Sequence, residues 1–327
     1  MTASLRAAVV GYGYFGRFHA RHYHETPGAN FTFVADQDPD RRAAAAADYG
    51  VETVADHRDL IGKVDLVSIV VPTSVHHAVA RDLIDAGIHV LIEKPIAADL
   101  AQGEDLVRLA DARDVVLQVG HIERHSAAFR ALLPRLSRPL YIESERISPF
   151  KPRATDVDVV LDLMIHDIDL VIGMVGSRVV SADAIGAPVL TGTADLANAR
   201  IAFENGVVAT VTASRVSHKT ERMVRVFQRD SYIVCDFANL RLTEIRRDPD
   251  APVGNNPLDG LALETVNIPR QDSLANEIAE FLSCIREKRR PIVDGRVGCE
   301  ALRVANLIKE SMAERRRLIE RGAGLTV

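Results

Sequence analysis

The feature that most constrains the fold is a glycine-rich turn near the N-terminus, between a short apolar strand and a helix. The run from Leu5 to Val10 leads directly into Gly11-Tyr12-Gly13-Tyr14-Phe15-Gly16. Glycines at this spacing let the backbone turn tightly and approach a pyrophosphate held at the N-terminus of the following helix. Tight-turn glycines without a ligand are the alternative. The strand before the turn and the helix after it favour a dinucleotide site that contains Gly11, Gly13, Tyr14, Phe15 and Gly16.

An acidic residue follows at the distance that a ribose site requires. Asp36 ends the second strand-like run, 20 residues after Gly16. We expect its carboxylate to accept hydrogen bonds from the adenosine ribose and to repel a 2′-phosphate, which predicts NAD rather than NADP as the cofactor. Arg41 and Arg42 would favour the phosphate, but their position at the start of a helix also suits exposed arginines.

Apolar runs and helical patterns alternate from Leu5 to Val119. The later strand-like runs are Phe31 to Ala35, Leu66 to Val71, Ile88 to Ile92 and Val115 to Val119. Helical apolar spacing fills the segments between them, at Asp38 to Tyr49, Val75 to Ala86 and Asp99 to Ala112. The alternation predicts an α/β domain over residues 1–121, with the doubly wound parallel sheet of the Rossmann fold.

Two strand ends of this domain carry polar side chains. Parallel strands place their carboxyl ends at one edge of the sheet, where ligands bind. Pro72, Thr73 and His76 follow one run, and Glu93-Lys94-Pro95 follows the next. We expect both groups at the cofactor site, with Lys94 placed to meet a hydride donor and its acceptor. A first-turn surface histidine and a solvent-facing lysine are the alternatives.

Past residue 121 the pattern changes to consecutive strands with turn signals. The runs are Leu140 to Ile147, Ala199 to Phe203, Val207 to Ser214, Met223 to Gln228, Ile233 to Phe237 and Leu240 to Ile245. Glu204-Asn205-Gly206 predicts a hairpin turn. Residues 122–327 therefore form a predicted α+β domain with an open, mainly antiparallel sheet. We expect it to bind substrate and to form oligomers. The final helices, Ser273 to Glu287 and Val297 to Arg317, can pack on either domain, and Asp248 to Pro257 reads as a loop.

One helix of this second domain, from about Val157 to Val175, contains no Lys, Arg or Glu. Asp162, His166 and Asp169 recur on it at helical spacing, which suits a buried pocket wall better than a solvent-facing surface. Asp162 and His166 are four residues apart, so the carboxylate can orient the imidazole. These residue types also bind zinc, but no further ligand cluster with zinc spacing lies nearby, and we expect no metal.

Composition excludes several other classes of protein. The chain has 327 residues, a net charge of −5 and 47% hydrophobic residues, which suits two globular domains and offers no basic surface for nucleic acid or membranes. Its three cysteines, Cys235, Cys284 and Cys299, are far apart and suggest a reducing compartment. The N-terminal residues resemble no signal peptide, so we expect a cytoplasmic protein.

Four motifs occur together in one order: Gly11-x-Gly13-x-x-Gly16, Pro72-x-x-x-His76, Glu93-Lys94-Pro95 and Asp162-x-x-x-His166. With them the chain resembles the glucose-fructose oxidoreductase/inositol dehydrogenase (Gfo/Idh/MocA) family over nearly its whole length. The resemblance implies a homo-oligomeric oxidoreductase that uses NAD to oxidise a sugar or cyclitol hydroxyl. It places Glu93 and Lys94 near the nicotinamide and its ribose, and Lys94 and His166 at the reacting hydroxyl.

A narrower resemblance points to one branch of this family. Val119 to Arg124, Arg146-x-x-Pro149-Phe150-x-x-Arg153 and Asp162 to Leu170 look like the branch that oxidises C3 of UDP-N-acetylglucosamine-type nucleotide sugars. That branch supplies a 3-oxo sugar for amination and then for lipid A. Members of the branch often read Arg-Phe-Asn-Pro where this chain has Arg124-His125-Ser126-Ala127.

Three arginines are candidate ligands for the diphosphate of such a substrate. Arg124, Arg146 and Arg153 can form charge-assisted hydrogen bonds to phosphate, and surface arginines are the alternative. For the reaction itself, either Lys94 or His166 can accept the hydroxyl proton while Asp162 orients His166. A dehydrogenase of inositol, a free aldose or UDP-N-acetylglucosaminuronate is the alternative enzyme, and an NAD-responsive regulator on the same fold is the alternative without catalysis.

Overall fold

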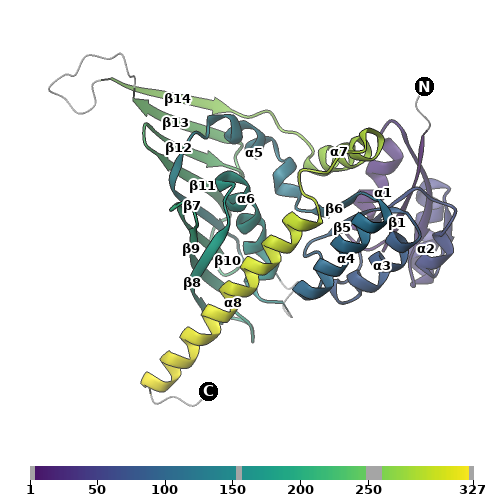
Figure 1. Ribbon diagram of the computed structural model, residues 1–327, viewed down its shortest axis with the longest axis horizontal. Coiled ribbons are helices and arrows are strands. Elements are labelled where there is room, and N and C mark those ends of the chain that lie inside the picture. Colours follow the sequence, from purple (N-terminus) through teal and green to yellow (C-terminus); the bar gives the residue numbers. More distant parts are fainter. Residues whose placement is uncertain (1–3, 152–156, 248–259, 324–327) are drawn as a thin grey trace. The chain divides into compact units, whose positions relative to one another are not determined.

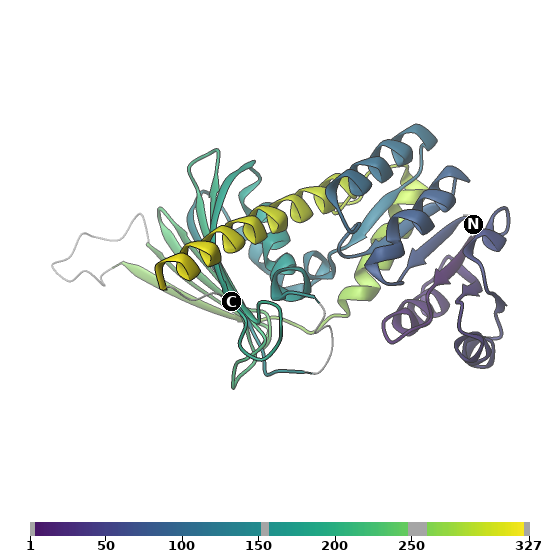
Figure 2. The same ribbon diagram turned by 90° about the horizontal axis from the view of Figure 1, so that it is seen from below.

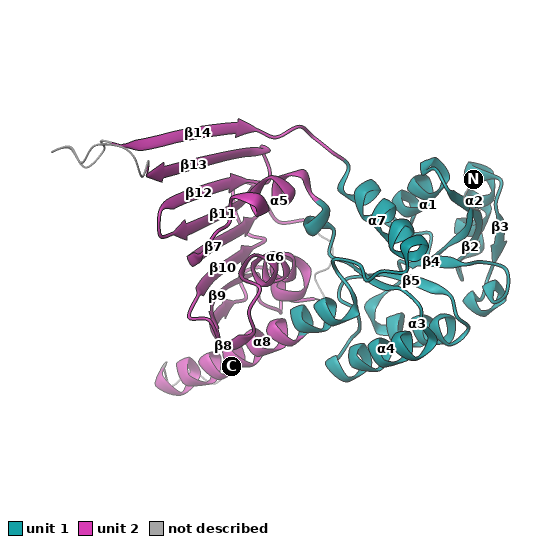
Figure 3. Cartoon of the chain, turned by 45° about the horizontal axis from the view of Figure 1, so that its top comes forward, with its two compact units in different colours: residues 1–125, 272–302 teal, residues 126–271, 303–327 magenta. Residues whose placement is uncertain are grey.

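The computed structural model describes residues 4–151, 157–247 and 260–323 of the chain, which divides into two compact units (Figure 3). Unit 1 holds residues 1–125 and 272–302, and unit 2 holds residues 126–271 and 303–327. The sequence predicts a single domain boundary after residue 121 and allows the final helices to pack on either domain. In the structure the chain returns to unit 1 for residues 272–302.

Unit 1 is built on a six-stranded sheet in the order β3-β2-β1-β4-β5-β6, with every neighbouring pair parallel. Its strands are β1 (Leu5–Val10), β2 (Ala29–Ala35), β3 (Glu52–Val54), β4 (Leu66–Ile69), β5 (His89–Glu93) and β6 (Leu117–Gly120). The order reverses between β1 and β4, the point at which open α/β sheets bind ligands beyond the carboxyl ends of their strands. The predicted Rossmann sheet is confirmed.

Helices cover both faces of this sheet (Figures 1 and 3). On one face, α1 (Gly16–Glu25), α2 (Pro39–Tyr49) and α7 (Ser273–Glu287) share a buried apolar cluster with β1 and β2. On the other lie α3 (His76–Asp85) and α4 (Leu100–Arg113). Asp38 caps α2 and Asp99 caps α4 by accepting backbone N–H groups of the first turn, so these helices begin near the predicted residues.

Unit 2 contains an eight-stranded sheet in the order β14-β13-β12-β11-β7-β10-β9-β8. The strands are β7 (Pro139–Ile147), β8 (Val179–Ala187), β9 (Leu196–Phe203), β10 (Val208–Ser214), β11 (Glu221–Gln228), β12 (Ser231–Asp236), β13 (Arg241–Arg247) and β14 (Leu261–Asn267). Only the β7–β10 pair is parallel among these strands, so the predicted mainly antiparallel sheet is confirmed. Gly206, at φ +87°, lies in the predicted hairpin turn between β9 and β10.

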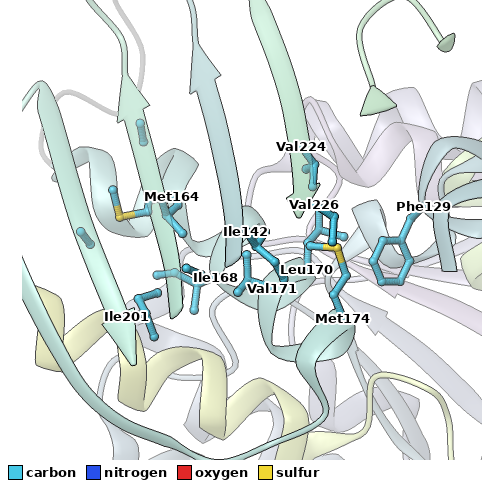
Figure 4. Close-up of a cluster of buried hydrophobic side chains, with 14 of the residues drawn as sticks. Phe129, Ile142, Met164, Ile168, Leu170, Val171, Met174, Ile201, Val224 and Val226 are labelled. Atoms are coloured by element: carbon cyan, nitrogen blue, oxygen red, sulfur yellow. The ribbon is translucent and has the colours of Figure 1, made fainter. Parts of the chain in front are cut away.

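Helices pack on one face of this second sheet. They are α5 (Ala127–Leu132), the π-helix η5 (Val160–Met164), α6 (Ile165–Val175) and the part of α8 (Gly295–Ala323) from residue 303. Figure 4 shows Ile168 and Val171 of α6 facing Ile142 and Ile201 of the strands. The long helix α8 is the yellow rod of Figures 1 and 2. Apolar burial on this face therefore holds α6 on the sheet.

Three strands of the structure are not predicted from the sequence. These are β3, which has only three residues, and the two edge strands β8 and β14. Almost every residue of β14 is exposed, so its sequence lacks the apolar alternation that marks a half-buried strand. The loop predicted from Asp248 to Pro257 lies outside the described residues.

Candidate active site

The glycine-rich turn has a shape that admits a pyrophosphate. A Cβ on Gly11, which has φ +95°, would lie 2.4 Å from Val70 O, and a Cβ on Gly16 would lie 1.9 Å from Gly11 O. Packing of the turn therefore excludes any side chain at these two positions. Gly13 differs, because its Cβ would meet nothing closer than Arg41 Nη1 at 3.8 Å. The fold does not need a glycine there, whereas a ligand that approaches the backbone does.

A pocket of about 850 Å³ opens beside this turn in unit 1. Gly11, Gly13, Asp36 and Pro72 contribute to its wall, as the sequence analysis expected of the cofactor site. The wall also includes residues that the sequence analysis did not select: Gln37, Asp56, His57 and Arg58 beyond β2 and β3, and Ser74, Val75, Ala78 and Val79 beyond β4. Asp56 to Arg58 were missed because β3, which leads into them, is too short to detect.

Asp36 is held firmly in the wall of this pocket. Its Oδ2 accepts the backbone N–H of Tyr12 at 2.6 Å, and its Oδ1 accepts that of Asp38 at 2.9 Å. Arg42 Nη1 donates to Asp36 O at 2.7 Å, so it supports the same loop, while Arg41 Nη1 lies 3.8 Å from Asp36 Oδ2. A negative charge is thus fixed where β2 ends, and one arginine lies beside it.

The segment after β4 is tied to the segment after β5 by His76. This side chain is buried, with Nδ1 2.9 Å from Pro95 O and Nε2 2.9 Å from Val71 O. Burial lowers the pKa of His76, while the two carbonyls favour its charged form. Thr73 begins the 3-10 turn η2 (Thr73–Val75) that leads into α3. Both ring nitrogens of His76 face backbone carbonyls, so a cofactor contact of His76 stays a prediction. The cofactor contact of Thr73 also stays a prediction.

Glu93 and Lys94 lie where β5 ends. Glu93 pairs with Gly120 of β6, and a Cβ on Gly120 would lie only 2.7 Å from Glu93 Oε1. His19 Nε2 lies 3.2 Å from the same oxygen. Lys94 is half-buried and follows the strand directly. Tyr14 is largely exposed, whereas Phe15 packs its ring against His19 and Phe18.

In unit 2, Asp162 and His166 lie on successive turns of one helical segment. Asp162 falls in the π-helix η5, and His166 falls in the first turn of α6. Both side chains are half-buried, whereas Asp169, predicted on the same face, is completely buried. Short π-helical segments cost stability and occur often at functional sites. Asp162 and His166 therefore remain the candidate reactive pair of this unit.

Asp167, the neighbour of His166, anchors this helix to the sheet. Its Oδ1 accepts the hydroxyl of Ser144 at 2.7 Å, and its Oδ2 accepts Arg146 Nε at 2.5 Å. Both members of the Arg146–Asp167 pair are buried. Arg146 is predicted as a ligand for a substrate diphosphate, and that role stays a prediction; the ion pair gives its Nε a structural partner. Ser144 and Asp167 were not selected, because nothing in the local sequence links β7 to α6.

A second buried pair fixes the start of the same helix. Arg215 Nε donates to Asp195 Oδ1 at 2.8 Å, and Arg215 Nη1 donates to Val157 O at 2.8 Å. Burial would raise the pKa of Asp195, but the Leu190 amide and the Arg215 guanidinium outweigh it and hold that pKa far below its usual range. Of the other predicted arginines, Arg124 lies half-buried in the 3-10 turn η3 (Ile122–His125), and Arg153 lies outside the described residues.

Within residues 4–151, 157–247 and 260–323, no group of three or more His, Cys, Asp or Glu side chains is arranged to hold a metal ion. No helix in the described part of the chain is both long enough and apolar enough to cross a bilayer.

Comparison with known proteins relates these features to a family. Residues 5–121 match an oxidoreductase family with an NAD-binding Rossmann fold, and residues 136–234 match the GFO/IDH/MocA C-terminal domain. UDP-N-acetylglucosamine 3-dehydrogenase of Acidithiobacillus ferrooxidans is 38% identical over 302 residues, which cover 92% of this chain and 95% of the relative. This chain belongs to the GFO/IDH/MocA oxidoreductase family. The predicted family, the enzyme class and the cofactor NAD are thereby confirmed.

Other relatives and solved structures are consistent with this assignment. A crystal form of the Acidithiobacillus ferrooxidans enzyme superposes with a TM-score of 0.88 at 38% identity, over 95% of this chain and 98% of that one. Myo-inositol 2-dehydrogenase of Thermotoga maritima is 25% identical over 95% of this chain and 97% of its own length. Levoglucosan dehydrogenase in complex with NADH and levoglucosan shares the fold, with a TM-score of 0.83 at 19% identity over 95% of this chain and 98% of that one.

The described residues of unit 1 fit the adenosine and pyrophosphate part of NAD. Gly13 leaves its backbone open, the first turn of α1 has no acidic side chain, and Asp36 presents a fixed carboxylate. The positive end of α1 suits a pyrophosphate, while Asp36 suits a ribose with a free 2′-hydroxyl. Val75 and Val79 add an apolar surface to the same pocket.

Proposed function

We propose that this chain oxidises the C3 hydroxyl of UDP-N-acetylglucosamine, or of a closely related nucleotide sugar, to the 3-oxo sugar with NAD. One observation carries the proposal. The relative with that activity in its name is 38% identical over 92% of this chain, whereas three inositol dehydrogenases that match over most of the chain or two thirds of it are 24–27% identical. The difference favours a nucleotide sugar over free inositol.

Each unit contributes one candidate for the proton acceptor. Bound NAD supplies the acceptor for the C3 hydride. Lys94 in unit 1 or His166 in unit 2 then takes the hydroxyl proton, and we retain both. A histidine titrates near neutrality and a lysine can be brought there by burial or a nearby positive charge, so either side chain suits a general base. We assign Asp162 to the orientation of His166 and to stabilising its protonated form.

The cofactor contacts of this proposal follow the wall of the pocket. We assign the pyrophosphate to Gly13, with Tyr14 and Phe15 beside it, and the adenosine ribose to Asp36. Pro72, Thr73 and His76 shape the segment after β4, while Glu93 and Lys94 serve the nicotinamide end. For the substrate diphosphate we retain Arg124, Arg146 and Arg153, and we add a structural role for Arg146, whose Nε donates to the buried Asp167.

The decisive test is NAD reduction with UDP-N-acetylglucosamine as the sole sugar. An added aminotransferase with its amino donor removes the 3-oxo product and draws the reaction forward. N-Acetylglucosamine, UDP-N-acetylglucosaminuronate, myo-inositol and a free aldose serve as comparison substrates. We expect turnover with the first compound to exceed that with each of the others, and a preference for inositol would replace the proposal by the alternative enzyme.

A variant pair ties the reaction to Lys94. We expect Lys94→Met to lower kcat by about 1,000-fold while NADH still binds, because a missing general base typically costs 10²- to 10⁴-fold. Lys63→Met, at an exposed lysine of the same unit, is the matched control and should retain full activity. Near-normal turnover of the Lys94 variant would remove this residue from the mechanism. NADH binding without turnover of any sugar would instead favour a regulator.

We also propose that unit 2 assembles with copies of itself through the outer face of its sheet. Tyr141, Phe227 and Tyr232 stack in sequence on that face, with ring centroids 5.6 and 4.7 Å apart. Phe227 is 36% exposed and Leu263 is 70% exposed. Exposed aromatic and aliphatic side chains of this kind are commonly covered by a partner subunit. Light scattering of Phe227→Arg should show a smaller particle than wild type, and an unchanged mass would count against this interface.

The site of action in the cell stays a prediction. All three cysteines are buried and none forms a disulfide. This supports a reducing compartment such as the cytoplasm. Delivery of the 3-oxo product to an aminotransferase and then to lipid A is likewise proposed from the relative and from the resemblance of the sequence to that branch.

A further inference from the structure

Four polar side chains form a connected line inside unit 1, ending at Glu93. Tyr23 Oη lies 2.8 Å from Ser68 Oγ, Ser68 Oγ lies 3.0 Å from His19 Nδ1, and His19 Nε2 lies 3.2 Å from Glu93 Oε1. Tyr23 and His19 come from α1, Ser68 from the middle of β4, and Glu93 from the end of β5. The first three are completely buried. A buried polar line of this kind is costly unless each member has its partner.

The direction of the protons along this line follows from its two ends. Burial raises the pKa of Tyr23, so the phenol keeps its proton, and among the described residues its hydroxyl has Ser68 as its hydrogen-bond partner. Tyr23 therefore donates to Ser68. At the other end the Glu93 carboxylate can only accept, so His19 Nε2 carries a proton and Nδ1 of the neutral ring accepts the Ser68 hydroxyl. His19 thus donates Nε2–H to a Glu93 carboxylate that accepts.

Glu93 is confined from a second side as well. The backbone of Gly120 lies so close that an added Cβ would be 2.7 Å from Oε1 and 3.0 Å from Oε2. Oε1 is taken by His19, while Oε2 has no hydrogen-bond partner among the described residues, and 14% of the side chain is exposed. Oε1 of the carboxylate therefore bonds to the interior, and Oε2 remains available to a ligand at the edge of the sheet.

We propose that His19 is a positioning residue for the nicotinamide end of the cofactor, acting through Glu93. The proposal rests on the proposed function, which assigns Glu93 to that end of NAD. His19 holds Oε1, and this directs Oε2 toward a hydroxyl of the nicotinamide ribose. Without the Nε2–H donor, the carboxylate can rotate and Oε2 loses its direction. Ser68 and Tyr23 support the tautomer that makes His19 a donor at Nε2.

The test compares two amide replacements of His19 in the full chain. The amide nitrogen of Gln overlays ring Nε2 and can still donate to Glu93, whereas that of Asn overlays Nδ1 and cannot reach it. NADH affinity is measured from the fluorescence of NADH, and ADP affinity by competition. We expect His19→Asn to weaken NADH binding by about 10-fold, the typical worth of one hydrogen bond to a charged group, and His19→Gln to stay within about threefold of wild type.

ADP separates positioning from general damage to the fold. It lacks the nicotinamide and its ribose, so we expect both His19 variants to bind ADP as wild type does. In a Glu93→Gln background, the effect of His19→Asn on NADH should fall below about twofold, because the interaction partner has changed. Equal losses for NADH and ADP, equal losses in the two His19 variants, or a full loss in the Glu93→Gln background would each overturn the proposal.

Two further variants cover a His19→Asn protein that does not fold. Gly120→Ala displaces the same carboxylate from its other side, and we expect it to weaken NADH but not ADP. His89→Asn replaces a histidine at the opposite end of β5, where Nδ1 accepts Val116 N–H, and should leave both affinities unchanged. Unaltered NADH binding in Gly120→Ala would contradict the proposal. No readout involves a sugar, so a failure with UDP-N-acetylglucosamine would refute the proposed substrate alone.

Discussion

The buried pair between Arg146 and Asp167 gives the sharpest prediction for unit 2. The two side chains are 5% and 2% exposed, with Nε and Oδ2 2.5 Å apart and the Ser144 hydroxyl on the other carboxylate oxygen. Asp167→Asn keeps the volume of the side chain but removes the negative charge that Asp167 places beside the buried guanidinium. Removing one partner of a buried ion pair costs about 3–5 kcal/mol, because an uncompensated charge stays in the interior.

That free energy converts to a measurable shift in thermal unfolding. For a unit of this size, 1 kcal/mol changes the midpoint by about 2–4 °C, so Asp167→Asn should lower the unfolding midpoint of unit 2 by roughly 10 °C. Scanning calorimetry of wild type and variant measures this shift. The double variant Arg146→Met/Asp167→Leu removes both charges and should recover most of the loss, since apolar replacement of a whole buried pair is often neutral.

The same variants test the earlier assignment of Arg146 to a substrate diphosphate. Under the structural role, Arg146→Met lowers the unfolding midpoint and reduces kcat through a displaced His166. Under an additional substrate role, Arg146→Met also raises KM for the nucleotide sugar, whereas Asp167→Asn lowers the midpoint with a smaller effect on that KM. An unchanged midpoint in Asp167→Asn would refute the reasoning from burial.

Three further predictions concern unit 1. Asp36→Ser removes the carboxylate that would repel a 2′-phosphate and bind the ribose. The ratio of kcat/KM for NADP to that for NAD should therefore rise about 10- to 100-fold. An unchanged ratio in steady-state assays would count against Asp36 as the residue that discriminates between the cofactors. Gly13→Ala should keep the wild-type unfolding midpoint and lose NADH binding. Gly16→Ala should lower the midpoint itself, because its Cβ would lie 1.9 Å from Gly11 O. A lower midpoint for Gly13→Ala than for Gly16→Ala would contradict the assignment of Gly13 to the ligand. Burial lowers the pKa of His22, His76 and His89. The unfolded chain therefore binds more protons than the folded one below about pH 6.5. The free energy of unfolding should decline with falling pH by at most about 1.4 kcal/mol per pH unit for each histidine. Urea titrations from pH 7.5 to 5 would measure that decline, and His89→Gln should make it shallower; equal slopes would rule out a share for His89.

The first 120 residues were predictable because their signals are local. A GxGxxG turn, an acidic residue at the end of the second strand and an alternation of strand and helix all occur within short windows of sequence. In the structure, packing requires glycine at Gly11 and Gly16 and does not require it at Gly13. Edge strands such as β14 were not predictable, since a strand that is exposed on both sides needs no apolar pattern.

Buried polar partners were the other feature that the sequence could not reveal. His19 and Glu93 are 74 positions apart, and Arg146 and Asp167 are 21 apart on different kinds of element. A charged residue in a sequence shows its chemistry but not its burial, so Arg146 was read as a ligand for phosphate while His19 was not selected. Only the packing of α1 on the sheet, and of α6 on β7, brings these partners together.

Each candidate proton acceptor is adjacent in the sequence to a carboxylate that other side chains hold by hydrogen bonds. Glu93 precedes Lys94 and is held by His19, while Asp167 follows His166 and is held by Ser144 and Arg146. Successive side chains of a helix diverge by about 100°, which separates His166 from Asp167, and Lys94 directly follows the end of β5. Holding one carboxylate therefore fixes the backbone beside each candidate base. In each unit the carboxylate with the interior partner therefore orders the backbone from which the neighbouring lysine or histidine extends.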